Sequence, residues 1–367
     1  MQMLKFGSRR VVLVATLTLA IGTCAGRAEL TAQSEVEAVG ESVDLWRARQ
    51  LYVSNRPEDH DPYRDHAADR LAKARTDSVY AAEAPGSYEF EKISYSSAVD
   101  DLEIPAYLFR PLGLRSAGSL PALVWVHGGV HGDWNPVYLP MVKEAVARGY
   151  VVIAPDYRGS IGYGAEFHDA IDYGGYEVDD VLMAVDYLSA EVEEVDPERI
   201  GVMGWSHGGF ISAHTVLREE HPFRAAAAIV PVSNLIFRLA YKGPAYQALF
   251  STQERIRGLP HERREIYVER SPVYHVDELE VPMLVHVATN DDDVDFVESE
   301  MFVNALRAKK PDLAETKVYV DPPGGHSFSL LVDRNLSVIE TPQLRDSWRR
   351  IWAFLDRNLQ PMSDWSN

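Results

Sequence analysis

The sequence has little cysteine, little positive charge, and neither internal repeats nor low-complexity tracts. Cys24 is the only cysteine, so the chain cannot form an internal disulfide and an oxidising compartment would not cross-link it. Acidic residues number 55 against 36 lysines and arginines, which gives a formal net charge of −19. This balance argues against a nucleic-acid-binding protein, because too little positive charge is present to neutralise phosphates.

An apolar run at residues 11–22 follows Lys5, Arg9 and Arg10. The run is too short to span a bilayer comfortably. A basic start, a short apolar run and small residues after it are typical of a secretory signal peptide. We therefore expect residues 1–28 to be a signal peptide and the protein to be exported, to the periplasm or outside the cell.

Cys24 lies just after this apolar run, where bacterial lipoproteins carry a lipid-modified cysteine. Residues 21–24 resemble the lipobox of those proteins, although Thr23 stands where a Gly, Ala or Ser is expected. Two alternatives follow from the sequence. Either Cys24 carries a lipid anchor, which would be the only link to a membrane, or ordinary cleavage occurs near Ala25 or Ala28.

Residues 29–85 form a polar N-terminal extension whose pattern is mostly helical, with an alanine-rich stretch at 65–82. A turn at 57–62 precedes that stretch and contains acidic and histidine side chains. Such side chains could suggest a metal site, but helix-capping aspartates in short polar turns are far commoner. We therefore predict no metal and no cofactor for this chain.

From residue 86 onward, predicted strands and helices alternate. Two segments with period-two alternation, at 88–95 and 102–109, predict a half-exposed antiparallel pair. The continuous apolar run at 122–126 is typical of a strand buried on both faces. Further strands are expected at 150–155, 199–203, 225–232, 283–287 and 317–320, and helices at 141–148, 178–188, 210–217, 296–306 and 344–359. This order predicts an α/β domain over 86–360, with a mostly parallel sheet covered by helices on both faces.

Ser206 lies at the centre of a Gly-x-Ser-x-Gly turn between a predicted strand and a predicted helix. At such a turn, Gly204 and Gly208 must be small so that the strand and the helix can pass closely. The serine oxygen is then exposed, and the backbone N–H groups that follow it point toward the same space. We therefore predict that Ser206 is a nucleophile.

A serine nucleophile that attacks a carbonyl needs two backbone donors for the oxyanion. The His207 N–H follows the nucleophile directly and is the first predicted donor. The loop after strand 122–126 contains a His-Gly-Gly motif, in which Gly129 is the predicted second donor. The residues near these turns that are candidates to line an acyl pocket are Val130, Trp134, Trp205, Phe210 and Phe328.

A serine nucleophile also needs a base and an acid that orients the base. His326 follows a predicted strand and two glycines, which free its loop to bring the ring over the serine. Four aspartates between residues 291 and 295 follow another predicted strand. Both loops lie at the carboxyl ends of strands, where open α/β sheets place their ligands. One of these aspartates is expected to orient His326, and calcium is excluded because Phe296 stands where a calcium loop requires glycine.

The segment 86–359 resembles the catalytic domain of the prolyl oligopeptidase family (peptidase family S9) of α/β-hydrolases. The matching stretches are His-Gly-Gly at 127–129, Asp-Tyr-Arg-Gly-Ser-Ile-Gly-Tyr-Gly at 156–164, Val-Asp-Pro-Glu-Arg-Ile-Gly at 195–201, Gly-Trp-Ser-His-Gly-Gly at 204–209 and Arg-Ser-Pro-Val-Tyr at 270–274. The family's acid is the first residue of an Asp-Asp-x-Val stretch, so the resemblance selects Asp291. It also implies that His326, in Gly-Gly-His, is the base.

The resemblance implies a serine peptidase that cleaves peptide bonds through an acyl-enzyme. Larger members of the family carry a β-propeller before the catalytic domain, but residues 29–85 are too few and too helical for one. A carboxylesterase acting on small acyl esters with the same residues is the alternative. A non-catalytic binding protein is disfavoured because all three catalytic positions are present. We also expect residues 234–269, with the extension, to form a small roof over the site.

Overall fold

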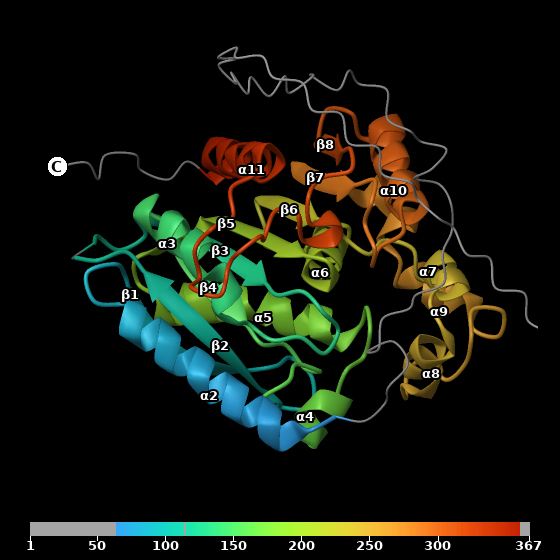
Figure 1. Cartoon of the computed structure of the whole chain (residues 1–367), viewed down its shortest axis with the longest axis horizontal. Helices are drawn as coiled ribbons and strands as arrows, with labels where there is room; N and C mark the ends of the chain where they lie inside the picture. Colours follow the sequence, from blue (N-terminus) through green and yellow to red (C-terminus); the bar gives the residue numbers. More distant parts are fainter. Residues whose placement is uncertain (1–63, 114, 360–367) are drawn as a thin grey trace, which may run out of the picture. The chain divides into compact units, whose positions relative to one another are not determined.

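The computed structural model describes residues 64–113 and 115–359, and Figure 1 shows how their elements follow one another. The predicted signal peptide, Cys24 and the turn at 57–62 lie outside the described residues. In the part of the chain that is described, no helix combines the length and the apolar character needed to cross a membrane.

The described strands form one sheet in the order β1-β2-β4-β3-β5-β6-β7-β8. β1 pairs with β2, and β2 with β4, in antiparallel fashion, whereas every later pair of neighbours is parallel. The strands are β1 (Glu89–Ser96), β2 (Glu103–Arg110), β3 (Leu120–Val126), β4 (Val151–Pro155), β5 (Val195–Trp205), β6 (Ala225–Ile229), β7 (Met283–Ala288) and β8 (Ala314–Tyr319). The predicted antiparallel pair and the mostly parallel sheet are therefore confirmed.

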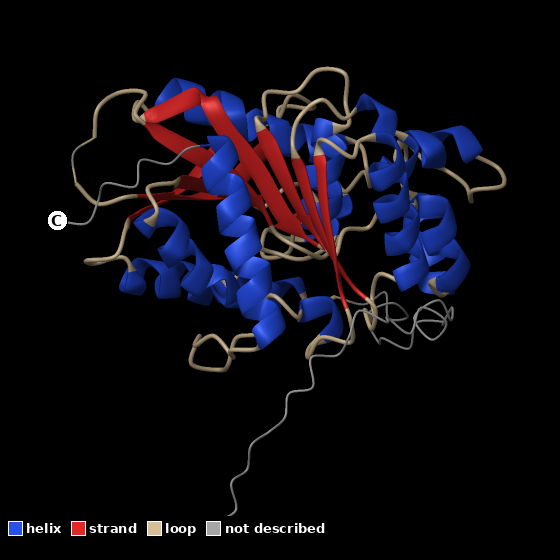
Figure 2. Ribbon diagram, turned by 90° about the horizontal axis from the view of Figure 1, so that it is seen from above, coloured by secondary structure: helices blue, strands red, loops and turns tan. Residues whose placement is uncertain are grey.

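Helices cover both faces of this sheet, as Figure 2 shows. One buried apolar cluster includes side chains of α3 (Leu139–Ala147) and α11 (Pro342–Leu359). The cluster on the other face includes those of α5 (Tyr176–Glu191), α6 (His207–Val216) and α10 (Phe296–Lys309). Because both faces are covered, β3 and β6 are buried along their whole length.

Shorter helical elements connect these layers. They are α4 (Ala165–Asp169), α7 (Leu235–Tyr241), α8 (Pro244–Thr252) and α9 (Arg264–Glu269), with single 3₁₀ turns η2 (Pro136–Tyr138), η3 (Pro272–Tyr274), η4 (Val276–Glu278) and η5 (Gly325–Ser327). The helices α7 to α9 make up most of the segment 234–269 predicted to form a roof. Several of their side chains, among them Leu239 and Phe250, belong to the same buried cluster as α5 and α6.

The end of the N-terminal extension is the helix α2 (His66–Glu83), which confirms the helix predicted at 65–82. In Figure 1 this helix lies along the edge of the sheet formed by β1 and β2. The rings around Tyr80, at centroid distances of 5.1–6.0 Å, are those of Phe90, Tyr107 and Phe109. The division predicted at residues 85 and 86, between extension and catalytic domain, therefore lies between α2 and β1, which pack against each other.

The last described helix, α11, has the buried face predicted from its sequence: Trp348, Ile351, Trp352 and Leu355 are all buried. The Trp348 ring lies 5.2 Å from that of Trp205 and 5.8 Å from that of Trp125, between ring centroids. Trp205 is the last residue of β5 and directly precedes Ser206. The packing of α11 therefore supports the turn on which the predicted nucleophile lies.

We expect Trp348→Ala to lower the free energy of unfolding by about 3–5 kcal/mol, because it leaves a large cavity among buried rings. Arg349→Ala is the matched control, since Arg349 lies on the exposed face of the same helix. It should change the free energy by no more than about 0.5 kcal/mol. Urea denaturation measures both, and equal effects would contradict this account of the packing.

Candidate active site

Ser206 has a strained backbone conformation, with φ 56° and ψ −118°, between the end of β5 and the start of α6. A positive φ is uncommon for a residue with a side chain and persists only where the surroundings enforce it. Here the Ser206 N–H donates to the Ile229 carbonyl at 2.9 Å, and the Ser206 carbonyl accepts the Phe210 N–H at 2.8 Å. The turn has the conformation expected for a nucleophile between a strand and a helix, although Ser206 is buried, with 8% of its surface exposed.

The two glycines of the Gly-x-Ser-x-Gly motif are required by backbone packing. A Cβ atom on Gly204 would lie 2.5 Å from the backbone of Gly208. A Cβ atom on Gly208 would lie 2.2 Å from the Val126 carbonyl oxygen at the end of β3. Neither contact is possible for real atoms, so α6 can pass this close to β3 and β5 only with glycine at both positions.

The loop after β3 passes directly beside Ser206. A Cβ atom on Gly128 would lie 3.4 Å from the Ser206 Cβ. The Gly128 N–H donates to the Tyr138 hydroxyl at 3.2 Å, and the Gly129 carbonyl accepts the Tyr157 hydroxyl at 2.6 Å. Gly129 itself is exposed and has φ +78°. Its role as a donor to an oxyanion stays a prediction.

His127 belongs to the support of this loop. It is fully buried, stacks on Tyr157 at 4.3 Å between ring centroids, and places Nε2 2.8 Å from the Ser160 hydroxyl. Burial lowers the pKa of its imidazole to about 4, so the ring is neutral at physiological pH. A neutral, buried ring with these partners positions the loop.

His326 contacts one of the four aspartates directly. Its Nδ1 lies 2.8 Å from both carboxylate oxygens of Asp291, which is buried. Asp291 Oδ1 also accepts the backbone N–H groups of Asp293 and Val294, at 2.9 and 2.8 Å. These contacts hold the carboxylate rigidly against the imidazole. A Cβ atom on Gly325 would lie 2.7 Å from the Asn290 carbonyl, so glycine is needed for the two loops to meet.

The pKa of His326 lies above its ordinary value. Burial alone would lower this pKa, because it disfavours the charged ring. The carboxylate of Asp291, through its charge and its hydrogen bond, outweighs burial, and the charge of Asp293 adds to its effect.

The other aspartates of this loop lie in three different environments. Asp292 is exposed. Asp295 is buried and caps α10 by accepting the Val297 N–H at 2.8 Å. Asp293 places Oδ2 3.6 Å from Nε2 of His326.

Sequence reasoning missed the partners of Asp293. Its Oδ1 lies 3.3 Å from an Arg238 guanidinium nitrogen and 2.5 Å from Lys242 Nζ, and both of these side chains are buried. Arg238 lies on α7 and Lys242 directly follows that helix. Their spacing of four residues within an otherwise apolar stretch was the available signal. The segment predicted to form a roof therefore reaches the loop that carries Asp291 and its neighbours.

The ring of His207 is buried beside the rings of Tyr157, Tyr173 and Phe210. Burial, with the nearby charge of Arg238, lowers its pKa to about 3. Nε2 lies 3.5 Å from a carboxylate oxygen of Glu177, and burial raises the pKa of that carboxyl to about 8. The imidazole of His207 is therefore neutral at physiological pH.

The candidate pocket residues are mostly core residues. The fully or almost fully buried members of the set are Trp134, Trp205, Phe210 and Phe328. Only Val130 is half-buried. Phe210 belongs to the buried apolar cluster on one face of the sheet. The other three aromatic side chains belong to the cluster on the opposite face. Their role in contacting a substrate stays a prediction.

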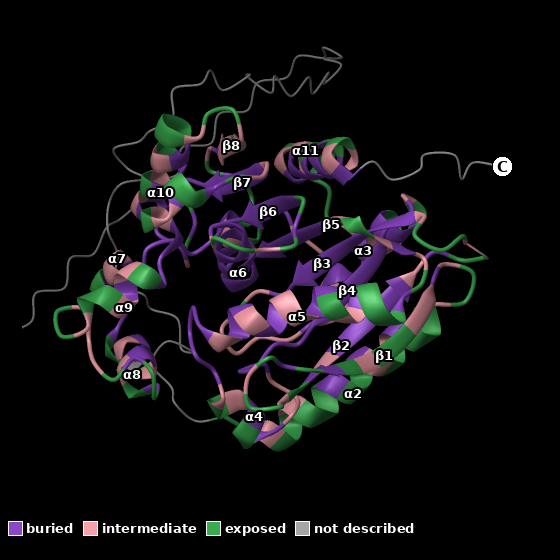
Figure 3. Cartoon of the chain, turned by 180° about the vertical axis from the view of Figure 1, so that it is seen from behind, coloured by how far each residue is buried: buried purple, intermediate pink, exposed green. Residues whose placement is uncertain are grey.

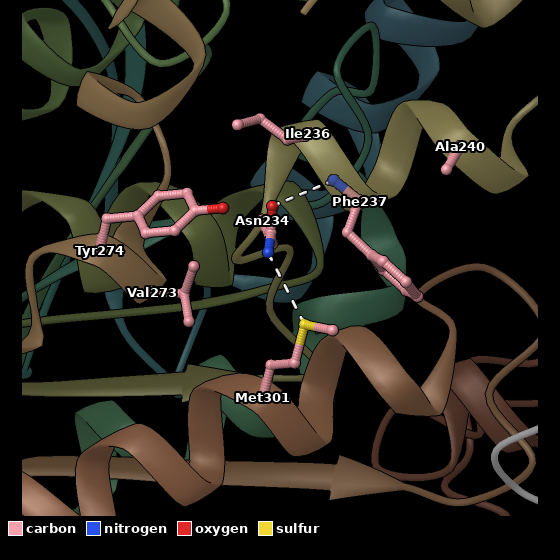
Figure 4. Close-up of a pocket in the computed structure, with 7 residues that line it drawn as sticks. All are labelled: Asn234, Ile236, Phe237, Ala240, Val273, Tyr274 and Met301. Carbon is pink, nitrogen blue, oxygen red and sulfur yellow. Dashed lines mark hydrogen bonds between the residues drawn. The ribbon is translucent and has the colours of Figure 1, made fainter. Parts of the chain in front are cut away.

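An open apolar hollow of about 500 Å³ lies between α7, η3 and α10 (Figure 4). Asn234 spans it by accepting the Phe237 N–H at 3.0 Å and by contacting the Met301 sulfur at 3.7 Å. The hollow is lined by Asn234, Ile236, Phe237, Ala240, Val273, Tyr274 and Met301. None of the predicted catalytic residues is among them.

Known proteins resemble this chain in sequence. The model of the prolyl oligopeptidase family matches residues 133–361. The uncharacterized peptidase YuxL of Bacillus subtilis is 31% identical over 241 residues, which are 65% of this chain and 36% of that protein. The acylamino-acid-releasing enzyme of Mus musculus is 25% identical over 249 residues, 65% of this chain and 32% of that enzyme. The chain thus spans about a third of the length of these relatives.

The fold is also that of solved structures. The acylaminoacyl peptidase of Pyrococcus horikoshii superposes with a TM-score of 0.61 at 21% identity, over 79% of this chain and 45% of that one. The similarity confirms the predicted α/β-hydrolase architecture. The family match covers well over half of the sequence and includes the Ser206, Asp291 and His326 turns. The chain therefore belongs to the prolyl oligopeptidase family of α/β-hydrolases, peptidase family S9.

Proposed function

We propose that the protein is an exported serine peptidase that cleaves a peptide bond through an acyl-enzyme. The observation that carries this proposal is the pairing of His326 with Asp291, together with the strained turn at Ser206. Strained backbone conformations cluster at active sites, where the surrounding structure enforces them. A non-catalytic binding protein would need neither the strain nor the rigidly held imidazole.

In the proposed reaction, His326 Nε2 takes the proton of the Ser206 hydroxyl as its oxygen attacks the carbonyl carbon. Nδ1–H stays bound to Asp291, which fixes the tautomer and stabilises the imidazolium that forms. The imidazolium then gives its proton to the leaving amine, and the C–N bond breaks. Water deacylates the enzyme by the same proton transfers in reverse order.

The oxyanion of each tetrahedral intermediate is assigned to the N–H groups of His207 and Gly129. His207 is the first residue of α6, so its N–H adds the partial positive charge of a helix start. The close approach of Gly128 to the Ser206 Cβ supports the second assignment, since it brings the loop beside the reacting centre. Donors aimed at a developing charge act mainly on the transition state.

A carboxylesterase with the same three residues is the alternative function. The names of the relatives, a peptidase and acylamino-acid-releasing enzymes, favour the peptide bond. Residues 234–269 also border the site through Arg238, next to Asp293. We propose that this segment restricts which substrates reach Ser206, in the place that a larger domain occupies in other family members.

Ser206→Ala should reduce turnover by at least about four orders of magnitude while leaving the fold intact, because the nucleophile is lost. The measurement is hydrolysis of a panel of N-acylated peptide amides and short acyl esters by both proteins, with circular dichroism as the control for folding. Cleavage of amides supports the peptidase, and cleavage of esters alone supports the carboxylesterase. A variant that keeps a tenth of the wild-type rate would refute the assignment of the nucleophile.

The pH profile should report the neutral form of His326. Only the neutral ring accepts a proton, so kcat/KM should rise with pH through the pKa of His326 in the free enzyme, above its ordinary 6.5. Asp291→Asn should lower turnover by about 10³–10⁴-fold and move this rise to lower pH, because the main cause of the raised pKa is removed.

Asp292→Asn is the matched control for this experiment, since Asp292 is the exposed neighbour of Asp291 in the same loop. It should leave both the rate and the midpoint of the pH profile close to those of the wild type. Equal effects of the two substitutions would mean that the loop acts only through its total charge, and would contradict the role of Asp291.

A further inference from the structure

The helix α2 carries a buried lysine that the proposed reaction does not use. Figure 3 shows that much of α2 is exposed, yet Lys73 is only 2% exposed. Burying an ammonium group is unfavourable by several kcal/mol unless the group is paired and hydrogen-bonded. A lysine at this position is therefore expected to form ion pairs and hydrogen bonds with buried groups.

Lys73 contacts the end of the loop that follows β3, at Asp133 and Trp134, and Asp156, which directly follows β4. Its Nζ donates to the Trp134 carbonyl at 2.8 Å and forms ion pairs with the buried Asp156 and, at 3.4 Å, with Asp133. Asp156 accepts the Trp134 N–H at 2.6 Å. Both backbone polar groups of Trp134 are thus bound by the Lys73–Asp156 pair.

Two further contacts connect this pair to the glycines beside Ser206. The Trp134 ring stacks on Tyr138 at 4.2 Å between ring centroids, and the Tyr138 hydroxyl accepts the Gly128 N–H. Asp156 Oδ1 lies 3.6 Å from Nε2 of His127, the residue that begins the loop. The loop is therefore held at both ends by groups that contact the carboxylate of Asp156 or the ring of Trp134.

The backbone around Lys73 leaves little freedom for its side chain. A Cβ atom on Gly162 would lie 2.8 Å from Lys73 Cβ and 2.9 Å from its Cγ. The segment at Gly162 therefore packs directly on the lysine stem, and the neighbouring Tyr163 hydroxyl donates to Asp156 Oδ2 at 2.6 Å. These contacts direct the ammonium group of Lys73 toward Asp156 and the Trp134 carbonyl.

We propose that Lys73 is a positioning residue for the oxyanion loop: by neutralising Asp156 and binding Trp134, it holds residues 127–134 so that the Gly129 N–H faces the reacting carbonyl. This inference rests on the proposed function, because it concerns the donor to the oxyanion. Lys73 would act mainly on the transition state, so its loss lowers kcat and leaves KM nearly unchanged.

The test compares Lys73→Met with the wild type after titration of active sites. Methionine keeps an apolar stem of similar length and removes the charge. We expect kcat to fall by about 10- to 100-fold, since small displacements of catalytic groups have effects of this size. KM should change less than about threefold. The affinity for a peptidyl trifluoromethyl ketone, which binds serine as an oxyanion, should weaken by a factor similar to that of kcat.

Lys92→Met is the matched control. Lys92 lies over the same two rings as Lys73, those of Tyr107 and Tyr163, and also pairs with an acidic side chain, Asp77 of α2. It is about one-third exposed and binds no group of the loop. Its substitution should leave kcat, KM and the affinity for the ketone within about twofold of the wild type, as is usual at surface positions.

The double variant Lys73→Met/Asp156→Asn removes both charges of the buried Lys73–Asp156 pair, and Asp133, the other partner of Lys73, is only half-buried. Its kcat should be no lower than that of Lys73→Met, because the two residues act as one unit. If the single variant does not fold, the double variant replaces it, with the same expected losses in kcat and in ketone affinity. A folded variant with wild-type values, or a loss of kcat without weaker ketone binding, would overturn the inference. An inactive wild type that no serine-directed reagent labels would instead contradict the proposed function.

Discussion

The close backbone contact between the end of β3 and the turn from β5 into α6 is the constraint on which the rest of the structure depends. Gly204 and Gly208 leave no space for a Cβ atom, and Gly208 lies against the Val126 carbonyl. Because the strands and α6 meet here without side chains between them, Ser206 is left in its strained conformation beside the loop of Gly128. The same backbone contact between β3 and the turn from β5 into α6 therefore belongs to both the core of the fold and the candidate site.

Around that contact, buried polar groups fix the loops at the carboxyl ends of the strands. Asp291 holds His326, and Tyr157 holds Gly129. Lys73 and Asp156 hold the end of the loop that begins at His127. The buried carboxylates of Asp156 and Asp291 each have a cationic or imidazole partner and further hydrogen-bond donors, as buried charges require in a medium of low polarity. In this account α2, although it lies at the outer edge of the sheet, takes part in positioning the reaction.

The elements of the fold that depend on local sequence patterns could be predicted from the sequence alone. The strands, α11 and the turn at Ser206 each follow from spacing within a few residues. Each occurs near its predicted position, although β5 begins at Val195 instead of residue 199 and β6 ends at Ile229 instead of residue 232. The choice of Asp291 needed the family resemblance, since four nearby aspartates look alike in the sequence. The pairs Lys73–Asp156 and Arg238–Asp293 were not foreseen, because 83 and 55 residues separate their members and no periodicity encodes such contacts. The aromatic candidates were buried because apolar rings near a turn gain more from the core than from a pocket.

The central claim is that Ser206 forms a covalent acyl-enzyme with the help of His326. The most direct measurement is the mass of the protein quenched in acid during turnover of an N-acylated peptide ester, followed by peptide mapping. The account predicts a mass increase equal to the acyl group, on the peptide that contains Ser206, and its absence in Ser206→Ala. Rapid hydrolysis with no adduct on that peptide, or an adduct on another residue, would contradict it.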